Sequence, residues 1–208
     1  MLTVHHLNNS RSQRVLWLLE ELGVEYEVRN YQRDAETNLA PQELLDIHPL
    51  GKSPVITDEG NTIIESGAII DYIVRHYGEG ELAPIPGTRA YEDYLQWMHY
   101  AEGSAMLPLM LKLYTSRLPD GGEALQPRIN SELDNHLGFM NQALEGHDWF
   151  VDDEFSAADI QLSFAPQVAK LLYSLDEFPN LEDFLTRIHG RDSYQRAIER
   201  GGPYAFGS

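Results

Sequence analysis

The sequence predicts an α/β domain followed by a domain built from helices. In the first 77 residues, short apolar runs typical of strands alternate with segments whose apolar residues recur at helical spacing. Residues 78–87 then hold three glycines and two prolines, which break any regular structure. Beyond them, strand patterns vanish. We therefore expect a first domain at residues 1–80, a linker at 81–88 and an all-helical domain at 89–208.

The first domain begins with a strand, a polar turn and a helix. Residues 2–7 are the strand candidate and residues 8–14 the turn; apolar residues at helical spacing then fill residues 15–22. Gly23 is a natural helix stop. A strand at residues 25–28, a helix, a strand that follows a proline, a hairpin with a second strand and a last helix complete the series. This order of elements is that of a thioredoxin-like domain.

The second domain is predicted as a series of helices. The first is a long helix over residues 89–117, bent at Gly103 and Pro108, which fit poorly in a helix interior. The others are expected at residues 124–145, 157–174 and 179–200, the last as one helix or two.

A capping box is predicted before the helix that starts near residue 157. Ser156 can accept from the free backbone N–H groups, and Asp159 can reach back to the Ser156 N–H. Phe155 and Ile160 occupy the two positions of a hydrophobic staple. We assign this motif to folding and give it no catalytic role.

Composition excludes several classes of function. The 208 residues include 15 basic and 33 acidic ones, a net charge of −18, which disfavours nucleic acid and anionic membranes as partners. There is no cysteine, so disulfides and a protein thiol mechanism are excluded. The eight histidines lack ligand spacing, and His5 and His6 should point to opposite faces of a strand, so no metal site is expected. No segment resembles a membrane span or a signal peptide, and we expect a cytoplasmic enzyme.

One stretch of the first domain gathers four kinds of recognition group on one edge of the small sheet. Lys52 supplies a positive charge, and a cis bond before Pro54 would turn the backbone N–H and C=O of Val55 away from any partner strand. Glu65 and Ser66 lie where a strand passes into a helix N-terminus, which favours a carboxylate. A ligand with a cationic amine, a peptide-like middle and two carboxylates would satisfy all four groups. A small peptide such as glutathione fits this description.

With these motifs, the chain resembles the cytosolic glutathione transferases, in particular the bacterial and fungal subgroup whose first turn carries serine followed by arginine. Here the pair is Ser10-Arg11, and the resemblance covers nearly the whole length. It implies a thioredoxin-like domain followed by an all-helical one, glutathione as co-substrate without a metal, and a homodimer.

Catalysis in this family needs the thiolate of glutathione. A thiol with a pKa near 8.5 is about 3% ionised at pH 7, and lowering that pKa by roughly two units requires about 2.7 kcal/mol. One charge-assisted hydrogen bond and a helix N-terminus supply about that much. From the residues alone, Ser10 simply caps the helix, as Asn9 or Ser12 could. The resemblance implies that Ser10 donates to the sulfur, whereas counting back from Gly23 would bring Asn9 or Arg11 to that place.

The resemblance also implies roles for the other binding groups. Lys52 should meet the glycyl carboxylate, Glu65 the γ-glutamyl amine and Ser66 the γ-glutamyl carboxylate. From the residues alone, Lys52 could be a solvated surface charge, and Glu65 could interact favourably with the helix dipole. Pro54 is expected to be cis, with the Val55 backbone on the cysteinyl residue, and Asn9 and Ser53 complete the set. Many relatives carry asparagine at the position of His48, whose role stays open.

The second substrate should be an apolar electrophile. Candidate pocket residues lie on the long helix that faces the first domain by analogy, and plain helix–helix core is the simpler interpretation for at least half of them. These candidates are Tyr100, Met106, Leu107, Met110 and Tyr114. The tail at residues 201–206 is expected to be irregular, and whether it folds over the pocket stays open.

We therefore predict a detoxifying glutathione transferase that joins the glutathione thiolate to hydrophobic electrophiles, with no nucleic acid or membrane partner. A glutathione-dependent isomerase or disulfide reductase on the same fold is the alternative. A regulatory or assembly protein that kept the fold and lost the chemistry is the alternative from another class.

Overall fold

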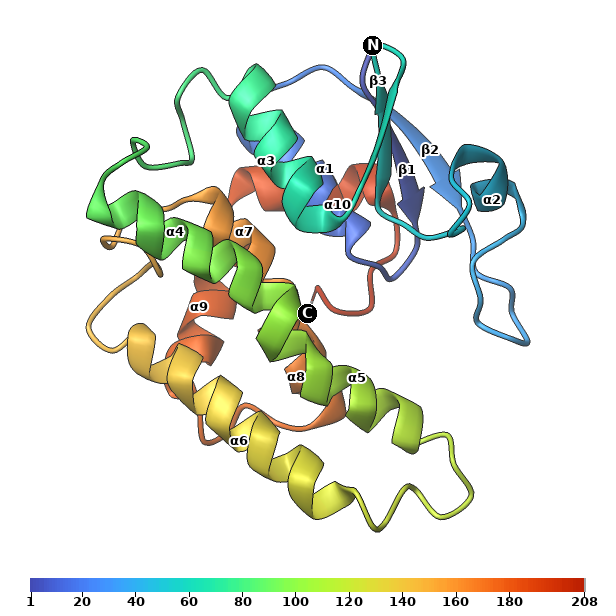
Figure 1. The fold of residues 1–208 in the computed structure, drawn as a ribbon, viewed down its shortest axis with the longest axis vertical. Helices are drawn as coiled ribbons and strands as arrows, with labels where there is room; N and C mark the ends of the chain where they lie inside the picture. Colours follow the sequence, from blue (N-terminus) through green and yellow to red (C-terminus); the bar gives the residue numbers. More distant parts are fainter. Residues whose placement is uncertain (208) are drawn as a thin grey trace. The chain divides into compact units, whose positions relative to one another are not determined.

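The computed structural model describes residues 1–207 and divides the chain into two compact units (Figure 1). The first unit consists of Met1–Leu82 together with residues 189–207, and the second is Ala83–Ile188. The first segment ends at Leu82, and the predicted linker spans residues 81–88. The expected helical domain at 89–208 differs, because its last residues pack with the first unit.

Within the described residues, the first unit contains one sheet of four strands in the order β2-β1-β3-β4. The strands are β1 (Thr3–Leu7), β2 (Glu27–Tyr31), β3 (Val55–Asp58) and β4 (Asn61–Ile64). β1 is parallel to β2 and antiparallel to β3, and β3 and β4 form an antiparallel hairpin. A βαβ unit followed by a β-hairpin confirms the thioredoxin-like prediction, although the second strand lies two residues later than expected.

The helix after β1 is buried on several sides. α1 (Ser12–Glu21) packs against β1, α3 (Ser66–Tyr77) and α10 (Asp192–Gly201). Every residue from 12 to 19 is therefore buried, polar side chains included. The apolar run from Val15 to Leu19 suits this central place. The remaining helix of the unit is the short α2 (Glu43–Ile47).

One carboxylate at the end of α1 holds the start of α10. Glu21 Oε2 accepts from Arg191 Nε at 3.2 Å, and both Arg191 Nη2 and Ser193 Oγ also donate to this carboxylate. Trp17 Nε1 lies 3.2 Å from Glu21 Oε2. Burial alone would raise the pKa of Glu21, but the hydrogen bonds from Arg191 and Ser193 outweigh it and leave the pKa below its ordinary value.

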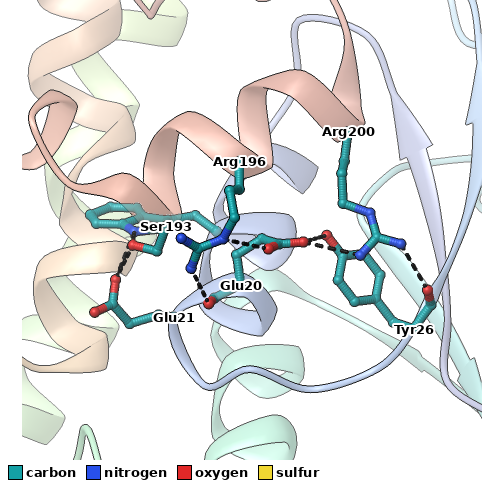
Figure 2. Close-up of polar contacts among 7 residues, drawn as sticks. Glu20, Glu21, Tyr26, Ser193, Arg196 and Arg200 are labelled. Carbon is teal, nitrogen blue, oxygen red and sulfur yellow. Dashed lines mark hydrogen bonds and ion pairs between the residues drawn. The ribbon is translucent and has the colours of Figure 1, made fainter.

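A second carboxylate holds the rest of α10 (Figure 2). Glu20 accepts from Arg196 Nε and from Arg200 Nη1, each at 3.1 Å, and from the Tyr26 hydroxyl at 2.8 Å. The Arg200 guanidinium also lies 4.2 Å from the centre of the Tyr26 ring. The two neighbouring glutamates thus bind α10 along its length.

The second unit is helical, and the bend predicted in its first helix takes a specific form. α4 (Arg89–Tyr100) passes through a π-helical turn, η1 (Ala101–Ala105), into α5 (Met106–Thr115). Pro108 has no N–H to donate, and its ring crowds the carbonyl of residue 104, so the helix widens one turn earlier. The helices that follow are α6 (Gln126–Ala143), α7 (Ala157–Leu162), α8 (Phe164–Leu172) and α9 (Pro179–His189).

The predicted capping box is present at the start of α7. Ser156 Oγ accepts from the Ala158 N–H at 3.3 Å, and Asp159 Oδ2 accepts from the Ser156 N–H at 2.8 Å. Asp159 Oδ1 additionally accepts from the Phe150 N–H at 3.0 Å, a contact that the motif did not predict. Burial raises the pKa of Asp159 to about 6. This side chain therefore joins the loop before α7 to the helix.

We expect Glu21→Gln to lower the free energy of unfolding by about 1–2 kcal/mol at neutral pH, because charge-assisted hydrogen bonds become neutral ones. The folded-state pKa of Glu21 lies below its ordinary 4.5, so its stabilisation is complete above that value and is lost as the pH falls through the folded-state pKa. Urea unfolding at about pH 7 and about pH 3 measures both effects. The matched control is Glu199→Gln on exposed α10 surface, and equal stability of all three proteins at pH 7 would contradict the expectation.

Asp159→Ala should lower the free energy of unfolding by about 2–4 kcal/mol, since it removes a cap and leaves two buried N–H groups without an acceptor. Thermal and urea unfolding measure this loss. Asp176→Ala, at an exposed position, is the control and should change stability by less than about 0.5 kcal/mol. A loss no greater than that of the control would show that the cap contributes nothing.

Candidate active site

The predicted recognition groups gather at one end of the four-stranded sheet. The strand register aligns His5 of β1 with Val55 of β3, and Val55 with Ile64 of β4. β1 therefore ends, β3 begins and β4 ends at the same end of the sheet. The loops that carry Ser10, Ser53 and Glu65 meet there, as Figure 1 shows for the ribbon.

The expected cis peptide bond joins Ser53 and Pro54, but the prediction for Val55 is wrong. β3 is an inner strand, and Val55 pairs with strands on both sides, so its backbone does not face away from partner strands. Ser53 donates its hydroxyl to the His5 carbonyl at 2.8 Å and accepts from the Leu7 N–H at 3.3 Å. In the described part of the chain, no backbone hydrogen bond involves Ser53. Its N–H and C=O, and not those of Val55, are therefore available to a peptide ligand.

Ser10 lies just before α1 and is almost fully buried, with 5% of its surface exposed. Its Oγ accepts from the Ser12 N–H at 3.2 Å and lies 2.7 Å from Ser12 Oγ. The oxygen thus accepts from a backbone N–H at the helix N-terminus, as both the capping and the thiol-binding interpretations require. Such a position favours an anion beside the hydroxyl.

His6 is a buried neighbour of this turn that the sequence did not identify. Its Nδ1 lies 2.8 Å from Ser12 Oγ, and its Nε2 lies next to Gly201 at the end of α10. Burial lowers the pKa of His6 to about 4. His5 faces the other way and bonds the Tyr31 hydroxyl at 2.9 Å, as strand alternation predicts.

Asn9 connects the first turn to the C-terminal tail. Its backbone has a φ of 50°, and its Oδ1 accepts from the Ala205 N–H at 2.8 Å. Its carbonyl accepts from Arg33 Nη2 at 3.3 Å. The tail after α10 therefore returns to the turn that carries Ser10. Tyr204 lies in this tail, and burial of its side chain raises the pKa of the hydroxyl well above its ordinary value. The sequence left the course of this tail open.

Ser66 and Glu65 stand at the N-terminus of α3, as predicted. Ser66 is buried and accepts from Arg14 Nη2 at 2.8 Å, while Glu65 is exposed. Glu65 has a φ of 67°, a left-handed conformation that costs a non-glycine residue about 1–3 kcal/mol and is concentrated at functional sites. Arg14 was missed, because it precedes the apolar run that begins at Val15 and was counted with the polar turn. Its buried guanidinium adds positive charge beside Ser66.

Lys52 and His48 occupy the loop before Ser53. Lys52 is exposed and has no ion-pair partner anywhere in residues 1–207, so its charge is available to a ligand. His48 Nδ1 accepts from the Leu50 N–H at 3.3 Å, which gives this side chain a local role in the turn.

The five pocket candidates on the long helix do not share one face. In the second unit, Leu107 and Tyr114 are 60% and 57% exposed, and Met110, one turn from each, lies between them on α5. Met106 is buried in the core of the unit, and the Tyr100 hydroxyl bonds His136 Nδ1 of α6 at 2.7 Å. Leu107, Met110 and Tyr114 thus share one apolar face on which Met110 is half-buried. Met106 packs internally, whereas Tyr100 is half-buried and lines a surface cavity with Gln96 and His99.

Residues 1–207 lack two further features. No group of three or more histidine, aspartate or glutamate side chains lies close enough to hold a metal ion. No helix in that range combines the length and the apolarity that crossing a membrane requires.

Comparison with known proteins places the chain in a family. The family model "Glutathione S-transferase, N-terminal domain" matches residues 1–75, and "Glutathione S-transferase, C-terminal domain" matches residues 103–192. Glutathione S-transferase 3 of Schizosaccharomyces pombe is 31% identical over 216 residues, which cover 96% of this chain and 88% of that protein. A crystal structure of a glutathione S-transferase from Actinobacillus pleuropneumoniae has a TM-score of 0.89 at 30% identity, covering 99% of this chain and 94% of that one. The chain belongs to the glutathione S-transferase family.

A more distant relative carries a different kind of name. "Probable elongation factor 1-gamma 1" of Arabidopsis thaliana is 23% identical over 198 residues, which cover 91% of this chain and 47% of that protein. This relative is not named as a transferase.

Proposed function

We propose that this chain is a glutathione transferase that joins the thiolate of glutathione to a hydrophobic electrophile. The observation that carries the proposal is the position of Ser10, whose hydroxyl lies at the N-terminus of α1 and at the same end of the sheet as the peptide-binding groups. Family membership supports glutathione as the co-substrate. Cytoplasmic location and a homodimer are part of the same proposal.

The two ends of the tripeptide are assigned to opposite charges. The Lys52 ammonium binds the glycyl carboxylate, and Glu65 binds the γ-glutamyl amine. Ser66 donates its hydroxyl hydrogen to the γ-glutamyl carboxylate while it accepts from Arg14, whose charge strengthens the site for an anion. The Ser53 backbone, which makes no backbone hydrogen bond within residues 1–207, bonds the cysteinyl peptide groups.

These contacts hold the cysteinyl sulfur at Ser10. The Ser10 hydroxyl and the N-terminus of α1 stabilise the thiolate relative to the thiol, and about 2.7 kcal/mol of this preference lowers the thiol pKa by two units. The thiolate then attacks the electrophile and forms a thioether.

A non-catalytic binding or assembly protein is the second candidate, favoured by the elongation-factor relative. A disulfide reductase is the third candidate. Since the chain has no cysteine, both thiols for this reaction would come from two glutathione molecules. Retention on immobilised glutathione separates the assembly protein from both enzymes. Assays with an aromatic halide and with a mixed disulfide then separate the transferase from the reductase.

We expect Ser10→Ala to reduce kcat/KM with an aromatic halide about 100-fold, since it removes one donor to the thiolate. The Kd for glutathione should change less than about threefold, because the binding groups at both ends of the peptide remain. Steady-state kinetics and calorimetry measure the two quantities. Ser116→Ala, at an exposed position on the second unit, is the matched control, and wild-type turnover of Ser10→Ala would remove Ser10 from the mechanism.

Lys52→Ala should raise the Kd for glutathione about tenfold, which corresponds to about 1.4 kcal/mol, and should leave kcat at saturating glutathione near wild type. The wild-type affinity should also weaken with added salt, because an exposed charge is screened. Lys170→Ala is the control for loss of an exposed ammonium. Unchanged glutathione affinity in Lys52→Ala would contradict the assigned contact.

A further inference from the structure

Arg33, in the loop after β2, binds the backbone of the turn that carries Ser10. Its Nε donates to the Asn8 carbonyl at 3.2 Å, and its Nη2 donates to the Asn9 carbonyl at 3.3 Å. Within residues 1–207, no backbone N–H donates to either carbonyl. Arg33 therefore supplies the hydrogen bonds that the two residues immediately before Ser10 do not find in the backbone. The function proposed above gives this arginine no role.

The orientation of Arg33 is itself fixed at two further points. Its backbone N–H donates to Asn8 Oδ1 at 2.9 Å, and its Nη1 donates to the Asn38 carbonyl at 3.2 Å. Asn38 belongs to a closed loop, in which its N–H donates to the Asp34 carbonyl at 2.9 Å. Three nitrogens of one rigid planar group thus bind three carbonyls, so the guanidinium joins the Ser10 turn to the loop that follows β2.

The turn needs such support because it is short and contains a left-handed residue. β1 ends at Leu7 and α1 begins at Ser12, so four residues make the connection. Asn9 has a φ of 50°, a conformation that asparagine tolerates better than most residues but that glycine alone adopts freely. A change in the Asn9 backbone rotates the next residue, Ser10, whose Oγ now accepts from the Ser12 N–H at 3.2 Å.

The side chain of Asn9 is held by a different segment of the same unit. Its Oδ1 accepts from the Ala205 N–H in the tail at 2.8 Å. The tail therefore fixes the side chain, and Arg33 fixes the carbonyl that leads into Ser10. Of these two contacts, the one from Arg33 acts directly on the peptide group that Asn9 shares with Ser10.

We propose that Arg33 is a positioning residue that fixes the turn before α1, so that the Ser10 hydroxyl meets the sulfur of bound glutathione. This inference rests on the proposed function. Arg33 acts through the backbone of Asn8 and Asn9 and does not itself touch the sulfur. Arginine suits this role because its nitrogens point in separate directions, whereas the ammonium of a lysine is a single point. A misplacement of about 1 Å in a reacting site costs up to about 100-fold in rate.

The test compares Arg33→Ala and Arg33→Lys with the wild type, each as the full chain. The alanine variant removes all three side-chain contacts, and the lysine variant keeps the positive charge but loses the planar fork. Arg75→Ala is the matched control, because Arg75 lies on α3 of the same unit, is 59% exposed and pairs with Asp71. The ultraviolet absorbance of the thiolate is titrated on the glutathione complex. Steady-state kinetics with an aromatic halide, calorimetry with glutathione and urea unfolding complete the comparison.

We expect both Arg33 variants to raise the apparent pKa of the bound thiol by about 0.5–1 unit and to lower kcat about five- to tenfold below neutral pH. The Kd for glutathione should change less than about threefold, because Lys52, Glu65 and Ser66 hold the peptide from other segments. Arg75→Ala should keep the wild-type values of all three quantities.

A purely structural contact would give a different result. Lower stability of Arg33→Ala with an unchanged thiol pKa and kcat would overturn the inference, and so would a wild-type profile for Arg33→Lys, since charge alone would then suffice. If Arg33→Ala does not fold, Arg33→Lys decides the question. In each of these cases the transferase assignment stands. Absence of any thiolate signal in the wild type with bound glutathione would instead refute the proposed function on which the inference rests.

Discussion

The burial of α1 between β1, α3 and α10 is the constraint on which the candidate site depends. Successive residues of a helix are rotated by about 100°, so Ser12 and Arg14 point to nearly opposite sides of α1. One reaches His6 on β1, and the other reaches Ser66 on α3. Because the helix is enclosed, it cannot turn without breaking both contacts. The same packing therefore fixes both the turn that carries Ser10 and the Arg14 guanidinium beside Ser66.

The order of elements could be predicted because it depends on local signals. Apolar periodicity, the glycine and proline segment before residue 88 and the capping box at Ser156 each act within a few residues, and the structure contains all three features. The interrupted helix around Pro108 could also be expected, since the missing N–H of proline is a property of that residue alone.

The errors and omissions at the site concern contacts between distant segments. The sequence correctly predicted the cis bond before Pro54, but the pairing of Val55 on both sides depends on where β1 and β4 lie. The contacts of Arg14 with Ser66 and of His6 with Gly201 join residues far apart in the chain. Composition carries no signal for such pairs, and the return of residues 189–207 to the first unit was missed for the same reason.

The site also reverses the overall electrostatic character of the chain. With 33 acidic and 15 basic residues, the protein repels anions at long range. The candidate site nevertheless holds two positive charges: Lys52, the only lysine before residue 80, and Arg14, which is buried beside Ser66. Long-range attraction is therefore a poor account of how a doubly carboxylated peptide is bound, and short-range contacts have to supply the specificity.

The dependence of the first unit on residues 189–207 has a consequence for biosynthesis. A ribosome makes the sheet, α1 and α3 early, but α10 emerges after the whole of the second unit has been translated. Until then, the face of α1 that α10 covers stays open to water, and Glu20 and Glu21 lack their arginine partners. The nascent chain therefore exposes an unfinished apolar surface during most of its synthesis, which is the interval in which holding chaperones would act.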